Sequence, residues 1–545
     1  MRGLMMETPL LVSSIIRHAA VNHGDTEIVS QSADGTRHRY TYSDAYRRSC
    51  RLANALTSLG VQPGDTVGTL AWNGYRHFEA YYGISGLGAV CHTINPRLFQ
   101  EQIVYIINHA EDKYVLFDTC FIKLVEELAG RCAAVEGWIA MCDRDMMPDS
   151  PLPNMFCYEE LIGTERDDCD WPSLDENQAC GLCYTSGTTG HPKGVLYSHR
   201  STVLHAMTAA LPDAMDLSAR DTVMPVSSMF HVMAWGLPYT AALVGARVVL
   251  PGPKLDPASL YRLFEEERVT MSGGVPTIWL GLIAYMQQNS LQLSSLKRVV
   301  VGGAACPRSV IATLEDDFGV EVVHAWGMTE MSPIGTLNRM KATHAELSSD
   351  QRHDLQMKQG RGVFGVEMKI VDGDGSDVPR DGKAFGDLMV RGPWICRSYH
   401  KQTDEEMLRD GWFSTGDVAT IDADGYMQIT DRSKDVIKSG GEWISSIELE
   451  NLAVGHPAVQ EAAVIGVPHP KWTERPLLLA VMKHGATVSR EDLLGFYDGK
   501  VARWWVPDDV VFVDELPHTA TGKVLKTSLR DTYRNYQLPT AQPQS

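Results

Sequence analysis

The chain lacks the features that would point to a membrane span or a nucleic-acid partner. No formal charge falls between Asp221 and Arg247, but Pro225, His231 and Pro238 interrupt this segment, which predicts a buried strand–helix region. Lys and Arg number 49 against 68 Asp and Glu, and the net charge of -19 argues against nucleic acid, whose phosphates require concentrated cations. Anionic ligands must therefore be bound by local donors.

A regular cysteine framework is also absent. The 11 cysteines are an odd number and are scattered, which predicts free thiols in a reducing, cytoplasmic setting. Cys180 and Cys183 have CxxC spacing, but they lie in an apolar run, so we expect them to be buried by packing. The N-terminus has no basic region followed by a long apolar stretch, so no export signal is expected.

Helix and strand patterns alternate through the first third, which predicts α/β layers with partly parallel sheets. A helix is expected to begin at Thr41–Asp44, and strands are expected at 67–71, 113–117, 246–250 and 297–301. From about Lys369, turn sequences separate alternating strands, which predicts an antiparallel or barrel-like subdomain. An α+β pattern follows residue 435. We therefore predict a large domain over 1–433 and a small one over 434–545, with the boundary near Lys434.

A loop rich in hydroxyls and glycines follows the apolar run at 179–183. Its candidate phosphate ligands are Thr185, Ser186, Gly187, Thr188, Thr189, Gly190 and Lys193. Glycines let backbone N–H groups close on an anion, while hydroxyls and a lysine add donors and positive charge. Pro192 and Gly194 flank the lysine, so the loop is not a Walker A motif. A plain surface turn is the alternative, but the composition favours polyphosphate binding.

Three further segments suit a nucleotide. Small residues after the strand at 297–301 allow a flat ring to approach the backbone, although they also suit a tight turn: Gly302, Gly303, Ala304 and Ala305. The next segment ends in an acidic residue, and comprises His324, Ala325, Trp326, Gly327, Met328, Thr329 and Glu330. A carboxylate beside phosphates requires a cation, so Glu330 is the candidate Mg²⁺ ligand. Asp417 and Arg432 can bind ribose hydroxyls, the alternative being a surface ion pair.

In this order the motifs resemble the adenylate-forming superfamily, which includes acyl-CoA synthetases and luciferases, over nearly the whole chain. The resemblance implies an AMP-forming acid–CoA ligase that uses ATP, Mg²⁺ and coenzyme A, with Thr329 donating to phosphate. It also implies that Lys523 bridges the carboxylate and the α-phosphate, stabilising charge in the transition state. Lys434 occupies the hinge about which the small domain rotates. After rotation, the thioester step would use Lys438, Gly440, Gly441, Glu442 and Trp443.

The acyl pocket is expected at 229–236, although Phe230, Val232 and Met233 suit a core stripe equally well. The sequence from Phe230 to Trp235 resembles the acyl gate of fatty acyl-CoA synthetases that have a gating tryptophan. The resemblance places the acid against His231, Trp235, Gly302, Gly303, Trp326 and Pro333. Trp326 replaces the family's usual tyrosine and should narrow the cavity. Within the family the chain most resembles bacterial ligases of 3-(methylthio)propionate, an acid from dimethylsulfoniopropionate breakdown. Short- to medium-chain fatty acids are the alternative substrates.

Two other classes remain for comparison. A carrier-loading adenylation enzyme would carry out the same first step, whereas a non-catalytic nucleotide sensor would not need Lys523, a hinge and an acyl gate together. Some relatives are homodimers, so a homodimer is expected by analogy.

Overall fold

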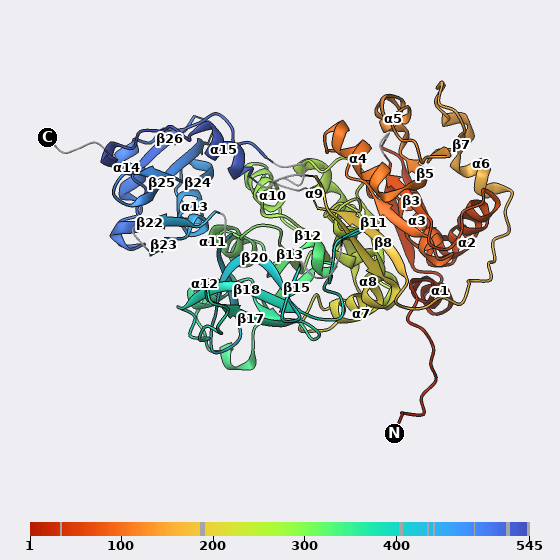
Figure 1. Ribbon diagram of the computed structural model, residues 1–545, viewed down its shortest axis with the longest axis horizontal. Helices are drawn as coiled ribbons and strands as arrows, with labels where there is room; N and C mark the ends of the chain where they lie inside the picture. Colours follow the sequence, from red (N-terminus) through yellow and green to blue (C-terminus); the bar gives the residue numbers. More distant parts are fainter. Residues whose placement is uncertain are drawn as a thin grey trace.

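Two sheets of mainly parallel strands form the body of the protein (Figure 1). The computed structural model describes residues 1–32, 35–185, 191–402, 407–432, 435–439, 442–483, 485–518 and 524–541. In order across the nine-stranded sheet lie β16 Arg361–Gly362, β15 Ile334–Leu337, β14 Glu321–Gly327, β13 Arg298–Val301, β12 Met271–Gly274, β10 Thr222–Pro225, β11 Arg247–Leu250, β1 Glu27–Gln31 and β2 Arg37–Thr41. Those from β14 to β1 run parallel, and the edges are antiparallel.

The seven-stranded sheet leads to the phosphate loop. Its strands, in order, are β7 Met155–Cys157, β6 Gly137–Ala140, β5 Asp112–Phe117, β3 Thr66–Leu70, β4 Val90–Thr93, β8 Ala179–Tyr184 and β9 Gly194–Ser198. All neighbours are parallel except β8 and β9, which form an antiparallel hairpin. The loop therefore leaves the carboxyl end of a buried strand and returns along the same sheet.

Helices cover both faces of each large sheet. One hydrophobic core joins the facing sides of the two sheets through α1 Val12–Asn22, α2 Tyr42–Ser58, α3 Tyr75–Gly86, α7 His199–Ala209 and α8 Leu237–Val244. The outer face of the nine-stranded sheet packs on α9 Pro257–Glu266, α10 Pro276–Gln288 and α11 Arg308–Ala312. The outer face of the seven-stranded sheet packs on α4 Gln100–Ala110 and α5 Ile122–Ala129. Two short helices, α6 Tyr158–Gly163 and α12 Ser349–Gln356, lie in connections.

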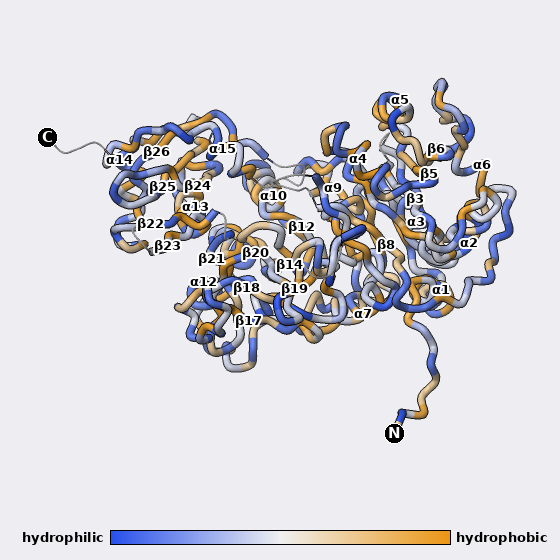
Figure 2. Tube along the Cα trace, in the orientation of Figure 1, coloured by the Kyte–Doolittle hydropathy of each residue, from blue (hydrophilic) through white to orange (hydrophobic). Residues whose placement is uncertain are grey.

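Two smaller sheets complete the fold. The first is antiparallel and comprises β17 Glu367–Val371, β18 Phe385–Arg391, β20 Trp412–Ile421, β19 Leu408–Arg409 and β21 Met427–Arg432. The second holds β23 Glu442–Ile444, β22 Ile437–Ser439, β25 Thr473–Met482, β24 Val459–His469 and β26 Asp509–Phe512, with α13 Ser446–Val454, α14 Arg490–Gly495 and α15 Lys526–Thr532. This last unit, blue in Figure 1, has its own apolar cores, and Figure 2 shows hydrophobic residues in orange along parts of its chain.

The layered α/β prediction and the small α+β unit are confirmed. The four expected strands occur as β3, β5, β11 and β13, and α2 begins where expected, because Thr41 and Asp44 cap it reciprocally. Turns at 372–376 and 422–426 join antiparallel strands, as their sequences indicated. The boundary at Lys434 stays a prediction, since that residue lies outside the described residues.

The segment at 221–247 is the buried strand–helix region that was expected. It supplies β10, the turn η3 Val232–Gly236 and α8. In the described part of the chain, no helix is both long and apolar enough to cross a membrane.

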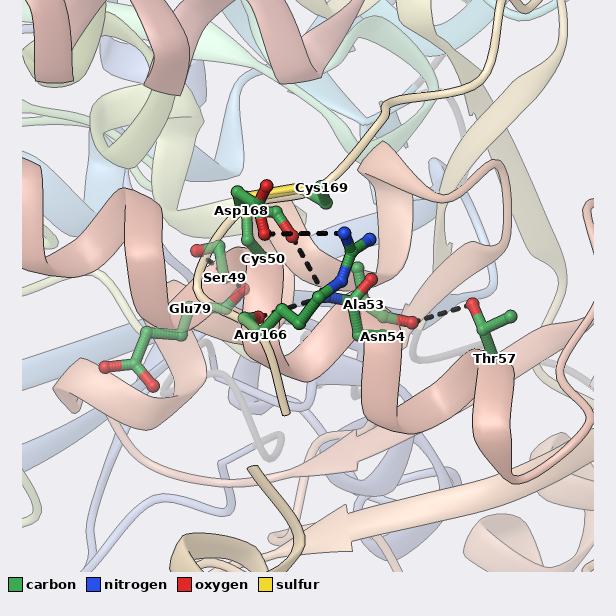
Figure 3. Close-up of a disulfide and its surroundings, with 9 residues drawn as sticks. All are labelled: Ser49, Cys50, Ala53, Asn54, Thr57, Glu79, Arg166, Asp168 and Cys169. Carbon is green, nitrogen blue, oxygen red and sulfur yellow. Dashed lines mark hydrogen bonds and ion pairs between the residues drawn. A yellow bond between two sulfur atoms is a disulfide. The ribbon is translucent and has the colours of Figure 1, made fainter. Parts of the chain in front are cut away.

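The expectation that all cysteines are free thiols is wrong for one pair. Cys50 on α2 is disulfide-bonded to Cys169, with the Cα atoms 5.2 Å apart (Figure 3). The segment before Cys169 is also bound to α2, because Asn54 Nδ2 donates to the carbonyls of Arg166 and Asp168, each at 3.0 Å. The partners are 119 positions apart in sequence, so their spacing alone could not reveal the pairing.

Thiol counting tests this assignment. Alkylation of the unfolded, unreduced chain is expected to modify the nine cysteines outside the disulfide, because Cys50 and Cys169 have no free thiol to react. Reduction before alkylation should expose both remaining thiols, which intact-mass measurement would count. Full alkylation without reductant would contradict the disulfide.

Candidate active site

The candidate site lies where parallel strands of both large sheets end. Tyr184 ends β8, Gly274 ends β12, Val301 ends β13 and Gly327 ends β14. Ligands of open α/β sheets bind outside such carboxyl ends, where loops can converge. The two sheets are tied together here, because the Tyr197 hydroxyl on β9 donates to the carbonyl of Thr329 at 2.7 Å.

The described parts of the phosphate loop form the neck of the β8–β9 hairpin. The Thr185 N–H donates to the Lys193 carbonyl at 2.9 Å, which closes the neck. Lys193 is exposed, and its ammonium lies 4.8 Å from the centre of the Tyr399 ring. The remaining predicted ligands lie outside the described residues: Ser186, Gly187, Thr188, Thr189 and Gly190.

Glu330 is a buried carboxylate on the short turn Thr329–Met331. Its Oε1 accepts a hydrogen bond from the Tyr399 hydroxyl at 2.7 Å. Burial raises the pKa of Glu330, whereas the Tyr399 hydrogen bond and the charge of Arg432 lower it. Burial and the neighbouring carboxylate also raise the pKa of Tyr399, so its hydroxyl keeps the proton that it donates. One tyrosine thus contacts both the predicted phosphate lysine and the predicted metal ligand.

The donor chemistry at Glu330 fits Mg²⁺. Carboxylate oxygen is a ligand that Mg²⁺ prefers, and this ion is usually held by one or two carboxylates plus substrate phosphates. Among the described residues there is no cluster of three or more His, Cys, Asp or Glu that could bind a metal alone. If the phosphates of the nucleotide supply the other ligands, Glu330 alone can provide the protein carboxylate for Mg²⁺.

Trp326, Asp417 and Arg432 form a connected group on the nucleotide side. The indole Nε1 of Trp326 donates to Asp417 Oδ2 at 3.0 Å, and Arg432 Nε lies 2.8 Å from Asp417 Oδ1. Asp417 is buried, and it is paired in register with Arg432 where β20 lies beside β21. Trp326 therefore contacts the predicted ribose carboxylate, which the sequence did not indicate. Its predicted effect on the width of the acyl cavity stays a prediction.

The turn at 302–305 is held by a neutral histidine. His324 Nε2 accepts from the Cys306 N–H at 3.2 Å, and its Nδ1 lies 3.0 Å from the Gln356 carbonyl. Burial lowers the pKa of His324 to about 4, so the ring stays neutral at pH 7. Gly303 has a positive φ of 82°, whereas Ala304 is exposed and Ala305 partly exposed. His324 thus contacts the backbone at the end of the turn that is predicted to bind adenine.

Glycine is required where β14 turns towards Glu330. A β-carbon on Gly327 would lie 2.1 Å from the carbonyl oxygen of Pro333. The same carbonyl accepts from the Met328 N–H at 3.1 Å, which closes the turn. Pro333 and Met328 therefore shape the loop that carries Thr329 and Glu330.

The expected acyl gate at Trp235 lies next to the turn at 302–305 that is predicted to bind adenine. A β-carbon on Gly302 would lie 3.5 Å from the Trp235 indole and 3.5 Å from the Ala325 β-carbon. His231 precedes the turn and is partly exposed. The residues Met233, Ala234 and Trp235 have φ values of 44°, 52° and 58°, a left-handed conformation that costs ~1–2 kcal/mol per residue. Close packing must therefore hold this turn in place.

The C-terminal candidates lie on a different sheet. Lys438 is exposed on β22, and its N–H donates to Glu474 Oε2 at 2.9 Å. Glu442 and Trp443 belong to β23, which pairs with β22. Lys434, Gly440, Gly441 and Lys523 lie outside the described residues, so the hinge and the adenylation lysine stay predictions.

Sequence reasoning missed Tyr399 and Tyr197. Tyr399 is 69 positions from Glu330, and Tyr197 is 132 positions from Thr329. No periodicity or motif spacing connects residues so distant in the chain. The only available signal was that a buried carboxylate needs hydrogen-bond partners.

Comparisons with known proteins show which family the chain belongs to. The family model described as "AMP-binding enzyme" matches residues 16–400, and "AMP-binding enzyme C-terminal domain" matches residues 448–523. A relative from Ruegeria lacuscaerulensis named 3-methylmercaptopropionyl-CoA ligase is 57% identical, covering 98% of this chain and 99% of its own. A medium-chain-fatty-acid–CoA ligase from Ectopseudomonas oleovorans is 52% identical, covering 98% of each chain.

Solved structures show the same architecture. The anthranilate CoA ligase AuaEII in complex with anthranoyl-AMP has a TM-score of 0.85 at 27% identity, covering 96% of this chain and 98% of its own. A fatty acyl CoA synthetase from Mycobacterium tuberculosis has a TM-score of 0.71 at 27% identity, covering 96% and 98%. The chain therefore belongs to the AMP-binding enzyme family, as an AMP-forming acid–CoA ligase that uses ATP and coenzyme A.

Replacing Trp326 with Phe tests the nucleotide side of the site. The change removes the indole N–H donated to buried Asp417, and a hydrogen bond to a charged group contributes about 1.5–3 kcal/mol. We expect the KM for ATP to rise by roughly 10-fold or more. Steady-state kinetics measures this, with Trp412→Phe, on the antiparallel sheet, as the control. An unchanged KM for ATP in Trp326→Phe would contradict the ribose assignment.

Proposed function

We propose that this ligase converts 3-(methylthio)propionate, ATP and coenzyme A into the corresponding thioester, AMP and diphosphate. Two relatives named 3-methylmercaptopropionyl-CoA ligase, at 57% and 54% identity over 98% of this chain, support the substrate. The observation that carries the site assignment is the contact of Tyr399 with both Lys193 and Glu330. Lys193 would bind the nucleotide phosphates and Glu330 would bind Mg²⁺, beside the acyl gate at Trp235.

In the first half-reaction, a carboxylate oxygen of the acid attacks the α-phosphorus of ATP. The bond from that phosphorus to the bridging oxygen breaks, and diphosphate leaves with the electron pair. Lys193 and the phosphate loop would bind the departing diphosphate, because a lysine and backbone N–H groups complement its charge. Mg²⁺ bound by Glu330 and the phosphates would neutralise charge that develops on the phosphate oxygens.

In the second half-reaction, the thiolate of coenzyme A attacks the acyl carbon and AMP leaves. A single surface cannot serve both steps equally well, so the C-terminal domain is proposed to rotate about Lys434. Lys523 would then leave the site, and the segment from Lys438 to Trp443 would take its place. The two glycines of that segment, Gly440 and Gly441, permit close approach of a ligand to the backbone.

The ribose and acyl ends of the site are proposed to meet at the carboxyl ends of β13 and β14. Asp417 would accept from the ribose hydroxyls while it keeps its bonds to Trp326 and Arg432. Trp235 and the thioether of Met233, whose methyl lies 3.5 Å from a β-carbon position on Gly181, would offer apolar surface to a short chain with sulfur. The homodimer and the cytoplasmic location stay predictions.

A carboxylate panel tests the substrate. We expect 3-(methylthio)propionate to give a higher kcat/KM than butyrate, hexanoate, octanoate and decanoate, measured by AMP and thioester formation. One methylene in an apolar pocket changes selectivity by only ~1–3 kcal/mol, so neighbouring chain lengths should react measurably. A maximum at octanoate or decanoate would instead favour a medium-chain fatty acid ligase. Formation of the thioester without AMP would contradict the proposed AMP-forming reaction.

Lys523→Ala tests the two-step assignment. Adenylation, measured by ATP–diphosphate exchange, should fall by at least ~100-fold because a cation that stabilises the transition state is lost. Thioester formation from pre-made acyl-adenylate should be preserved, since Lys523 is proposed to leave the site for that step. Equal loss of both activities would argue against rotation of the small domain.

A further inference from the structure

Three consecutive residues outside every sequence motif connect separate parts of the candidate site. We call Tyr399, His400 and Lys401 the 399–401 strap. Tyr399 contacts the Glu330 turn and Lys193, His400 contacts the β9 end of the phosphate hairpin, and Lys401 contacts the end of α4. The strap thus spans the loops that are proposed to bind phosphate and metal.

Tyr399 makes two different contacts with its two chemical faces. Its hydroxyl donates to Glu330 Oε1 at 2.7 Å, and its ring centre lies 4.8 Å from the Lys193 ammonium. A hydroxyl hydrogen bond fixes the direction of a carboxylate oxygen, while an aromatic face attracts a cation without fixing its direction. The Tyr399 hydroxyl contacts Glu330 through one carboxylate oxygen, Oε1, and its ring contacts the Lys193 ammonium without accepting a directed hydrogen bond.

The backbone of the strap is anchored on both sides of Tyr399. Before it, the Cys396 N–H donates to the Glu330 carbonyl at 2.8 Å. After it, the His400 N–H donates to the Gly194 carbonyl at 2.7 Å, and Lys401 Nζ lies 2.8 Å from Glu111 Oε1. Tyr399 is therefore held between the two loops that it contacts.

The His400 side chain extends the connection to α4. Its ring meets His109 edge-on at 5.4 Å, and His109 Nδ1 lies 2.7 Å from the hydroxyl of Tyr184, where the hairpin begins. Tyr105, one turn earlier on α4, stacks on His191 at 4.4 Å, on the other limb of the loop. These contacts connect α4 to both limbs of the phosphate hairpin.

We propose that Tyr399 is a positioning residue that holds the Glu330 carboxylate and the Lys193 ammonium at a fixed separation, so that Mg²⁺ and the nucleotide phosphates bind cooperatively. The proposal rests on the proposed function, which gives Glu330 to Mg²⁺ and Lys193 to diphosphate. Partners that orient a metal ligand typically change metal affinity or activity by ~10–100-fold when they are removed. Tyr399 would touch neither the ion nor the reacting atoms.

The test measures coupling between Mg²⁺ and nucleotide by binding, without turnover. Calorimetry gives the Kd of a non-reacting α,β-methylene analogue of ATP without Mg²⁺ and at saturating Mg²⁺, and the ratio of the two is the coupling factor. Tyr399→Phe keeps the ring under Lys193 but removes the hydroxyl. We expect the coupling factor to fall ~10-fold while the Kd without Mg²⁺ stays unchanged.

A second variant distinguishes the hydroxyl contact of Tyr399 with Glu330 from the contact of its ring with Lys193. Tyr399→Leu removes both contacts, so we expect the same loss of coupling and, in addition, weaker analogue binding without Mg²⁺. If Tyr399→Leu and Tyr399→Phe behave alike, the ring does not position Lys193, and the proposal in this form is overturned.

Tyr426→Phe is the matched control. Tyr426 also donates its hydroxyl to a protein oxygen, the Arg339 carbonyl at 2.6 Å, and also lies under a lysine, with Lys341 Nζ at 5.9 Å from its ring. Its hydroxyl and its ring contact Arg339 and Lys341 in place of Glu330 and Lys193, so the coupling factor of Tyr426→Phe should equal that of the unmodified enzyme. A fall as large as that of Tyr399→Phe would reveal a general loss of packing and overturn the proposal.

Glu330→Gln separates this inference from the proposed function. If Glu330→Gln abolishes coupling and Tyr399→Phe leaves it unchanged, the metal assignment stands and the role of Tyr399 is overturned. If Glu330→Gln leaves coupling unchanged, the metal assignment itself is wrong and the inference falls with it. Loss of coupling in both, with Tyr426→Phe unaffected, is the result that supports Tyr399.

Discussion

The burial of the Glu330 carboxylate is the constraint on which the candidate site depends. A buried charge is unfavourable unless it is hydrogen-bonded or paired, and Tyr399 supplies the hydrogen bond at 2.7 Å. Together with the backbone bonds of Cys396 and His400, this contact holds the 399–401 strap between the Glu330 turn and the phosphate hairpin. The strap, in turn, lies against the Gly194 end of the phosphate hairpin. A carboxylate that needs a partner thus connects loops contributed by three separate regions of the chain.

Much of this arrangement could be predicted from local sequence. The Thr41 cap, the apolar strands and the turn sequences each depend on neighbours within a few residues, and all occur as expected. The nucleotide segments could be recognised because glycines, hydroxyls and one acidic residue follow strand ends in a characteristic order. Tyr399 connects Lys193 to Glu330, and Asp417 lies close enough to Glu330 for its charge to raise the pKa of that carboxyl. Propensity and motif order therefore predicted the fold class and the reaction.

The rest depends on contacts that no local pattern encodes. The Trp326–Asp417 hydrogen bond joins residues 91 positions apart, and the Cys50–Cys169 bond joins residues 119 apart. Because tertiary packing selects these partners, the sequence indicated a wide indole in the acyl cavity but not its bond to Asp417. The sequence likewise predicts that His324 contacts the nucleotide, but it did not indicate that its two ring nitrogens contact the backbone of Cys306 and Gln356.

Activation of the acid requires one of its own oxygens to attack the α-phosphorus of ATP. This step can be followed with ¹⁸O from doubly labelled 3-(methylthio)propionate by mass spectrometry of the products. The oxygen that bridges the acyl carbon and phosphorus leaves with AMP, so we expect one ¹⁸O in each AMP and none in diphosphate. Unlabelled AMP, with the label in diphosphate or orthophosphate, would contradict the acyl-adenylate route.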